Sequence, residues 1–435
     1  MTRSTRARRH GTVVAAAALL TFGLAPAAAA HPEGPADSRD PGVVLAWNAI
    51  AWRTIAVEAM KPPPVAQFYL GLVSSAVYNA VVTVEGGGEP TLPQPDVDQE
   101  ASSEVAAATA AHDVLTAFFP ASAAALQADY DTWLAGVPSG QGRENGLKAG
   151  QDAAAALIAS REGDGRDAPI TLARPAVPPP GMWVPTGTGE WLTPWLGFTR
   201  PILIDSPTRF APDGPEPLGS EDYAEDLAEV ASMGAATGSG RSEEDTAMAL
   251  FYFDNPPRQY QDAMRDRAIR HEMGIVESAR MFAAANVSAA DATITCWRAK
   301  YESDYWRPVT AIHEADRDGN AATTADVAWN SLRPAPAYPE YPSGHGCVSS
   351  GTAEALANLF GKGHLDMDIV SLTPEVMGTT RHYDSADAWL DDVVDARIFL
   401  GIHFRDAMDD ARDVGRAVAD HVVDRWFSGH TGGDD

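Results

Sequence analysis

Two basic side chains in the C-terminal half have the spacing of an anion site. Lys300 and Arg307 lie seven residues apart, which is two turns of the helix expected over Ala289 to Trp306, so both side chains would share one face with Asp304 between them. Pro308 is expected to end this helix. Arginine offers planar forked donors and lysine a point charge, so the pair suits an anion with several oxygens. Taken alone, the pair is more typical of a surface stripe tied together by Asp304.

A second segment, Pro342 to His345, has the composition of an anion-binding helix start. Ser343 is a favourable N-cap for the apolar helix expected over Gly344 to Phe360. The backbone amides of Gly344 and His345 would then lie at the positive end of the helix, where anions bind. Histidine can also donate or accept a proton near neutral pH. By itself the segment is equally compatible with an ordinary capped helix that carries an incidental histidine.

The third segment contains Arg397 and His403, which are six residues apart. An unbroken helix would set them about 120° apart around its axis, but Gly401 permits a break that brings both side chains to one ligand. A histidine nitrogen aimed at the centre of a tetrahedral anion is a nucleophile toward phosphorus or an axial ligand toward vanadium. An interior Arg and His without a ligand is an equally common alternative. We expect all three segments to converge in one small cavity, because each alone coordinates an anion only partly.

In chain order the segments read Lys-x6-Arg-Pro, Pro-Ser-Gly-His and Arg-x5-His, and this combination resembles the superfamily of vanadium-dependent haloperoxidases and type 2 phosphatidic acid phosphatases. The resemblance extends from Val43 to Val423 and looks like the bacterial secreted haloperoxidase branch. It implies an all-α fold, a helical bundle with long loops. It also implies a site for vanadate, which phosphate can occupy as well.

The resemblance assigns a role to each residue of the three segments. His403 would bond the central atom of the oxyanion, which makes it the ligand to vanadium, and His345 would be the acid and base. Trp297 and Tyr338 fall where family members place residues near the halide. The oxyanion oxygens would be held by Lys300, Arg307, Ser343, Gly344 and Arg397.

Three positions depart from the family pattern. Ala396 stands where the family usually has a serine. The phosphatase form has an aspartate four residues after its last histidine, but here that position is Ala407 and the nearest carboxylate is Asp406. The partner that orients His403 therefore stays open. Tyr338 stands where members of known halide preference carry Phe or His, so that preference does not transfer.

These residues favour a secreted vanadate-dependent haloperoxidase, which oxidises halide with hydrogen peroxide and acts on a small organic acceptor. The same pocket chemistry suits an acid phosphatase on soluble phosphate esters, with a phosphohistidine formed at His403. A third function, from another class, is non-catalytic binding of an oxyanion. His345 argues against that third function, because simple capture needs no acid or base. Turnover of any kind would exclude it.

Helical periodicity dominates the rest of the chain, and alternating strand patterns are scarce. Helices are expected over Val43–Met60, Val65–Val84, Ser103–Phe119, Ala121–Ala135, Gly146–Arg161, Ser220–Met233, Glu243–Tyr252, Gln259–Ala285 and, as a pair, within Ala386–Trp426. The stretch from Gly163 to Gly219 is dense in Pro, Gly and Trp, which predicts a long ordered arm. We divide the mature chain into an N-terminal helical part with this arm (31–285), a C-terminal oxyanion-binding part (286–427) and a tail (428–435).

Residues 1–30 have the pattern of a signal peptide. Arg3, Arg6, Arg8 and Arg9 precede an apolar run and a tract of alanines that allows cleavage near Ala30. The sequence therefore predicts secretion, and the pair Arg8-Arg9 leaves both the general and the twin-arginine export route open.

Charge and hydropathy limit the partners of the mature chain. The formal net charge is −28 and becomes more negative when the arginines of the leader are removed, so nucleic acid and anionic membranes are poor partners. The apolar stretch from Val65 to Val84 is interrupted by Gln67 and Asn79, which predicts a core helix and no stable membrane association. A homo-oligomer remains possible.

Cys296 and Cys347 are the only two cysteines of the chain. They lie four residues before Lys300 and two after His345, so a converging site would bring them together. Export permits a disulfide, provided that the two α-carbons lie within about 7 Å of each other. We therefore predict a single disulfide between them.

Overall fold

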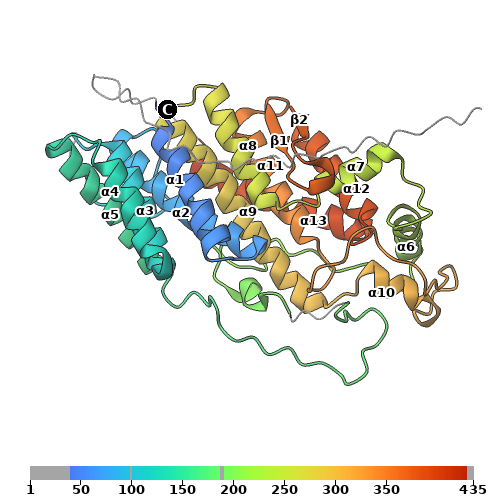
Figure 1. Cartoon of the computed structure of the whole chain (residues 1–435). Helices are drawn as coiled ribbons and strands as arrows, with labels where there is room; N and C mark the ends of the chain where they lie inside the picture. The colour runs from blue at the N-terminus through green and yellow to red at the C-terminus, as the bar shows by residue number, and fades with distance from the viewer. Residues whose placement is uncertain (1–39, 98–99, 187–190, 429–435) are drawn as a thin grey trace, which may run out of the picture. The chain divides into compact units, whose positions relative to one another are not determined.

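The computed structural model describes residues 40–97, 100–186 and 191–428 (Figure 1). The predicted leader and all but the first residue of the tail lie outside this part of the chain. The α-helices of the described residues are α1 (Gly42–Trp52), α2 (Pro63–Glu85), α3 (Ser103–Phe118), α4 (Ala123–Leu134), α5 (Gln141–Ser160), α6 (Glu221–Met233), α7 (Glu243–Phe251), α8 (Pro256–Arg270), α9 (Ile275–Ser303), α10 (Pro308–His313), α11 (Gly344–Phe360), α12 (Ala386–Phe399) and α13 (Arg405–Val422). α1 and α13 continue as π-helical turns, Arg53–Glu58 and Val423–Phe427.

Strands contribute little to the fold. Within the described residues, the sheet consists of β1 (Met367–Val370) and β2 (Thr380–Tyr383), which pair antiparallel with Met367 opposite Tyr383. The predicted all-α fold is therefore confirmed.

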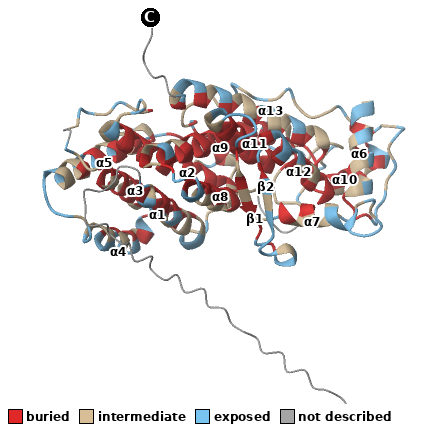
Figure 2. Cartoon of the chain, turned by 90° about the horizontal axis from the view of Figure 1, so that it is seen from above, coloured by how far each residue is buried: buried red, intermediate tan, exposed pale blue. Residues whose placement is uncertain are grey.

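The centre of the protein is formed by α2, α9 and α11. α9 packs against α2, α11 and α13, and Figure 2 shows α2, α9 and α11 buried along nearly their whole length. Small residues allow these helices to approach closely. A Cβ atom added to Gly71 of α2 would lie 3.0 Å from Ala290 of α9, and one added to Gly351 of α11 would lie 2.9 Å from Ala289. Such close packing fixes the helices that carry the predicted site.

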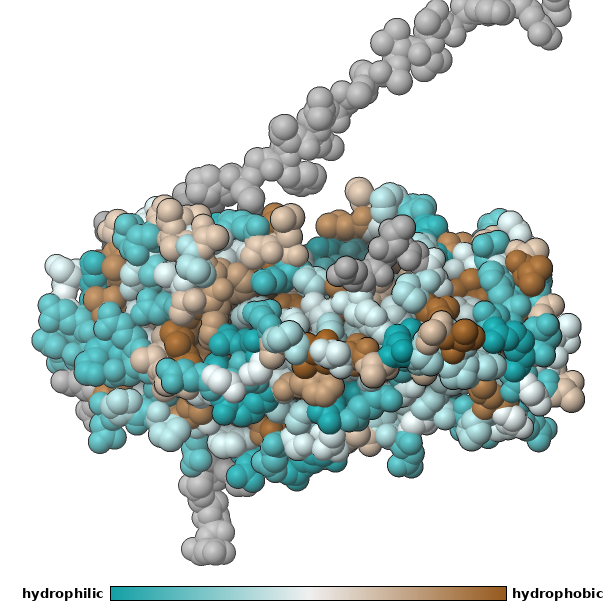
Figure 3. All heavy atoms as spheres, turned by 90° about the horizontal axis from the view of Figure 1, so that it is seen from below, coloured by the Kyte–Doolittle hydropathy of each residue, from teal (hydrophilic) through white to brown (hydrophobic). Residues whose placement is uncertain are grey.

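The apolar stretch Val65–Val84 forms α2 and confirms the predicted core helix. Of the described helices, α2 alone is long and apolar enough to cross a membrane, and its most apolar window is completely buried inside the protein. On the face drawn in Figure 3, hydrophobic residues are scattered among hydrophilic ones. The length and hydropathy of α2 are therefore explained by core packing.

The helix predicted over Gln259–Ala285 is wrong in its boundaries. The structure has two helices there, α8 and α9, separated by a turn at His271–Gly274 in which Glu272 adopts a φ of 48°. The separate helix predicted to begin at Ala289 is also wrong, because α9 runs unbroken through that position. The predicted limit between residues 285 and 286 falls inside α9, so the two predicted parts of the chain share this helix.

The arm predicted over Gly163–Gly219 is held against the C-terminal end of α9. The guanidinium of Arg174 lies 4.2 Å from the ring centroid of Trp191 and 5.3 Å from that of Trp183, and it forms an ion pair with Asp304. The backbone N–H of Trp183 donates to the carbonyl oxygen of Asp304 at 2.7 Å. Aromatic packing and these polar contacts order the arm next to the predicted site.

Candidate oxyanion site

Lys300 and Arg307 converge from two helices, although the sequence predicted one face of a single helix. Lys300 lies in the last turn of α9, which ends before Asp304 because that residue turns the chain with a left-handed backbone, φ 49°. Arg307 is the N-cap of α10. Pro308 begins this helix instead of ending the previous one, because a first-turn residue needs no N–H. Asp304 does not lie between the two cations, since its carboxylate pairs with Arg174.

Ser343 caps α11 as predicted. Its Oγ accepts the backbone N–H of Gly346 at 3.2 Å. Position 344 must be a glycine because Trp297 packs against it, and a Cβ atom there would lie 2.5 Å from the ring of Trp297. His345 follows within the same first turn. The start of α11 therefore packs directly on the α9 residue that the family resemblance places near the halide.

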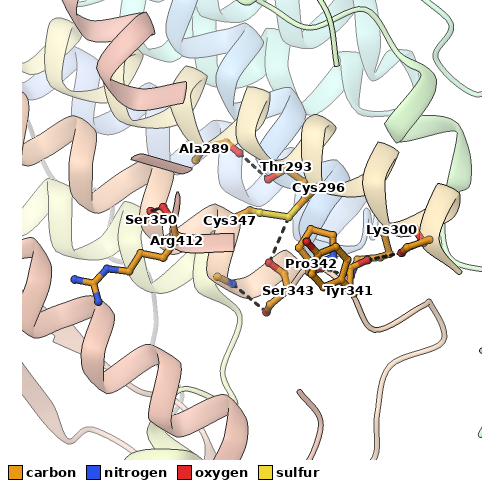
Figure 4. Close-up of a disulfide and its surroundings, with 12 residues drawn as sticks. Ala289, Thr293, Cys296, Lys300, Tyr341, Pro342, Ser343, Cys347, Ser350 and Arg412 are labelled. Atoms are coloured by element: carbon orange, nitrogen blue, oxygen red, sulfur yellow. Dashed lines mark hydrogen bonds between the residues drawn. A yellow bond between two sulfur atoms is a disulfide. The ribbon is translucent and has the colours of Figure 1, made fainter. Parts of the chain in front are cut away.

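The predicted disulfide between Cys296 and Cys347 is present, with the two α-carbons 6.6 Å apart. Figure 4 shows that it joins α9 to α11 beside Ser343 and Lys300. The bond thus links the helix that carries Lys300 to the helix that carries His345. It restrains the distance between two of the three predicted segments.

The third segment reaches the other two through a break in the helix. Arg397 lies in the last turn of α12, and His403 follows after Gly401, which has a φ of 77°. The guanidinium of Arg397 donates to the carbonyl oxygen of Tyr252 at 2.9 Å. Nε2 of His403 lies 3.2 Å from Nη1 of Arg307. The first and third segments are therefore in direct contact, while the shared oxyanion cavity stays a prediction.

Buried donor atoms at this convergence fit an oxyanion. Nη2 of Arg307, Nε of Arg397 and Nε2 of His345 are buried and have no hydrogen-bond partner among the described residues. Burial lowers the pKa of Arg397 to about 10. Lys300, Arg307, Arg397 and the carboxyl group of Glu340 are all buried, and burial raises the pKa of Glu340 to about 8. An anion with several oxygens would satisfy both the donors and the charge. Within the described residues, no group of His, Cys, Asp and Glu could hold a metal cation.

The ammonium group of Lys300 is bound to the main chain. Its Nζ donates to the carbonyl oxygens of Pro339 and Glu340 at 3.0 Å each, and to that of Pro342. These three carbonyls account for all three protons of the ammonium group. Lys300 therefore holds the loop before α11, although burial and the nearby Arg307 hold the pKa of its side chain well below the usual value. Direct contacts of Lys300 and Ser343 with oxyanion oxygens stay predictions.

The surroundings of both histidines disfavour the charged imidazolium. Burial holds the pKa of His345 well below its usual value, and the nearby Arg397 lowers it further. Burial also holds the pKa of His403 well below its usual value, with further lowering by Arg307 and Arg397. A bound anion would raise both pKa values, because it favours the charged imidazolium.

The carboxyl group in contact with His403 is that of Glu340, which the sequence did not reveal. Nδ1 of His403 lies 2.7 Å from Oε1 of Glu340, and both side chains are buried. Asp406, the nearest carboxylate in sequence, lies with Glu340 at a separate small cavity. The one available signal was an isolated acidic residue among the apolar residues just before Pro342.

The site borders a cavity of about 350 Å³. Gly344, His345 and Arg397 line it, and so do Trp297 and Tyr338, whose ring centroids are 5.3 Å apart. The outer wall consists of Pro63, Pro64, Phe253, Asp254, Asn255, Pro256, Pro257, Pro334, Pro336, Val348 and Ile402. The other predicted site residues, Lys300, Arg307, Ser343 and His403, are not part of this lining. A small solute in the cavity therefore reaches His345 and the aromatic pair first.

Comparisons with known proteins agree with this architecture. Residues 280–431 match the family model described as the VCPO second helical-bundle domain. The vanadium chloroperoxidase of Curvularia inaequalis is 24% identical over 293 residues, which cover 52% of this chain and 47% of that protein. The chain thus spans about half the length of this curated relative.

Two solved structures share the fold over most of the chain. A bacterial vanadium-dependent iodoperoxidase has a TM-score of 0.76 and 23% identity, covering 90% of this chain and 98% of its own. A bacterial vanadium-dependent chloroperoxidase in its holo form has a TM-score of 0.67 and 20% identity, covering 87% of this chain and 97% of its own.

Fold and site together describe a helical protein in which buried guanidinium and imidazole groups meet where helix ends and loops converge. The match over residues 280–431 relates this part of the chain to the VCPO second helical-bundle domain, and the solved structures share the fold of most of the chain.

Proposed function

We propose that the protein is a secreted vanadate-dependent haloperoxidase that oxidises halide with hydrogen peroxide. The observation that carries the proposal is the set of unpartnered buried nitrogen atoms on Arg307, Arg397 and His345, all of which lie near the imidazole of His403. The solved relatives, named as an iodoperoxidase and a chloroperoxidase, support the haloperoxidase reading. Vanadate, when bound, supplies the chemistry that activates peroxide toward attack by halide.

The residues of the chain would act as follows. Arg307 and Arg397 would hold oxyanion oxygens through their unpartnered donors, because guanidinium groups match such oxygens in charge and geometry. His403 would face the central atom with Nε2, since its Nδ1 is turned toward Glu340. His345 would exchange a proton with peroxide at Nε2, because this atom is unpartnered and the residue borders the cavity from which peroxide would enter.

The halide and a small organic acceptor would enter through the same cavity. Trp297 and Tyr338 form its aromatic part next to Gly344 and His345. The positive charge of the site favours an approaching anion. The ring of Tyr338 lies 4.9 Å from the guanidinium carbon of Arg307 and 5.2 Å from Nζ of Lys300. Of the residues that line the cavity, Tyr338 would therefore lie between a bound halide and these two basic side chains.

One observation favours a second function, hydrolysis of soluble phosphate esters. A carboxylate on Nδ1 and a lone pair on Nε2 are the arrangement required of a histidine nucleophile, and the contacts of His403 with Glu340 and Arg307 give it both. Phosphate would use the same donors as vanadate. Phosphoryl transfer to His403 would form the phosphohistidine, with the alcohol leaving after it accepts a proton from His345.

A direct comparison of the two reactions tests the proposal. The mature chain is purified, supplied with orthovanadate, and assayed for peroxide-dependent bromination and iodination beside hydrolysis of a phosphate ester. We expect halogenation that depends on vanadate. Ester hydrolysis that vanadate inhibits, without halogenation from acidic to neutral pH, would replace the proposal by the phosphatase. Oxyanion binding without turnover of either substrate would replace the proposal by non-catalytic binding of an oxyanion.

Secretion is a further part of the proposal and rests on the pattern of residues 1–30. Expression of the full sequence in a bacterium, followed by N-terminal analysis of the exported protein, should give His31 as the first residue. A cytoplasmic product that retains Arg8 and Arg9 would contradict export by this leader.

A further inference from the structure

The imidazole of His403 is held by one donor and one acceptor, and together they fix the position of its proton. Nη1 of Arg307 lies 3.2 Å from Nε2, and a guanidinium can only donate. Nε2 must therefore accept, so the ring proton of the neutral imidazole lies on Nδ1. That proton is donated to Oε1 of Glu340, 2.7 Å away.

Glu340 is itself fixed by contacts that leave this acceptor in place. Oε1 also accepts the backbone N–H of Phe404 at 3.1 Å. The backbone N–H of Glu340 donates to the carbonyl oxygen of Tyr305 at 2.8 Å, and its carbonyl oxygen accepts from Lys300. The buried ammonium of Lys300 thus holds the loop that presents the carboxylate to His403.

The second carboxylate oxygen of Glu340 makes no directional contact with the described residues. Oε2 is buried and unpartnered, and Glu340 lines a separate cavity of about 10 Å³ with Asp406 and Asp226. Any proton that Glu340 carries would reside on Oε2, because Oε1 already accepts two N–H groups. Nδ1 of His403 therefore remains the donor in either state of Glu340.

We propose that Glu340 is the positioning residue of His403, which locks the imidazole proton on Nδ1, so that the Nε2 lone pair, which accepts from Arg307 in the anion-free protein, can turn to the central atom of a bound oxyanion. This inference rests on the proposed function of the site. It supplies the orienting carboxylate that the sequence lacks four residues after His403. It also separates two kinds of anion, because a bond to Nε2 needs the lone pair, whereas phosphate held only by cations does not.

Three variants test the role of Glu340. Glu340→Ala removes the acceptor, and Glu340→Gln keeps an acceptor oxygen but loses the charge. Asp406→Asn is the matched control, because it removes another carboxylate that lines the same small cavity and has no hydrogen bond to His403 among the described residues. Each protein, free of anion, is labelled with ¹⁵N at histidine to locate the ring proton of His403. Each is then titrated with orthovanadate and, separately, with inorganic phosphate.

We expect the proton on Nδ1 in the wild type, in Glu340→Gln and in Asp406→Asn, and a mixture of tautomers in Glu340→Ala. Loss of a group that orients a metal-binding histidine typically weakens metal affinity about 10–100-fold, so Glu340→Ala should lose vanadate affinity by that factor. Its phosphate affinity should be unchanged or higher, because the cations remain and a negative charge is gone. Glu340→Gln should show a smaller loss for vanadate only.

Several results would overturn the proposal. These are a wild-type proton on Nε2, an unchanged vanadate affinity in Glu340→Ala, or equal losses for vanadate and phosphate, which indicate a purely structural role. If Glu340→Ala does not fold, Glu340→Gln decides by the same comparison of the two anions. A wild type that binds no vanadate defeats the proposed function, yet the tautomer in the wild type and the variants still decides the role of Glu340.

Discussion

Removal of the disulfide between Cys296 and Cys347 should destabilise both the fold and the oxyanion site. The two residues are separated by 51 positions, and closing a loop of that length stabilises a folded chain by about 4 kcal/mol in the chain-entropy treatment. Both side chains are fully buried. For a cooperative unit of this size, such a loss lowers the melting temperature by about 5 °C.

The assay compares the oxidised wild type with the double variant C296A and C347A by denaturant unfolding, and both with the wild type after reduction. Reduced wild type should fall to the level of the variant, which serves as the control for the alanine side chains. Phosphate affinity should also decrease, because the bond links α9 to α11. Two thiols that alkylate without reductant, or an unchanged free energy of unfolding in the variant, would refute the reasoning.

Three further predictions concern the site. His345→Ala should still bind vanadate but lose peroxide-dependent halogenation by about 10²–10⁴-fold, as expected for lost proton transfer, which steady-state assays at equal vanadate occupancy would show. Gly344→Ala should destabilise the fold by about 1–3 kcal/mol through overpacking against Trp297, measured by denaturant unfolding, and equal stability would contradict the contact. Phosphate binding should take up protons, because burial and Arg397 lower the pKa of His345 in the free protein and a bound anion raises it. Calorimetry in two buffers should show this uptake near the acid side of neutrality and less of it in His345→Ala.

Much of the helical framework could be predicted because its elements carry local signals. Ser343 and the apolar run after it defined α11 to the residue, and prolines and glycines bounded α2. The break between α8 and α9 was missed because it depends on Glu272, a residue that rarely adopts a positive φ. The end of α9 was missed for the same reason, because Asp304 also adopts a positive φ.

The site was predictable as a set of residue types but not as a set of contacts. Spacing identified the residues that converge, and Gly401 indicated the break that allows His403 to join them. Glu340 could not be found, because its partner lies 63 residues further along the chain and the contact exists only in the folded protein. The binding of Lys300 to main-chain carbonyls was hidden for the same reason.

Titration of the wild type and of His403→Ala with orthovanadate tests the central claim most directly. The cations and donors of Arg307 and Arg397 remain in the variant, so any difference reports the imidazole alone. The haloperoxidase proposal predicts that the wild type binds vanadate and that His403→Ala loses this binding and halogenation together, while it still binds phosphate. A variant that binds vanadate as tightly as the wild type would contradict the proposed bond between His403 and the oxyanion.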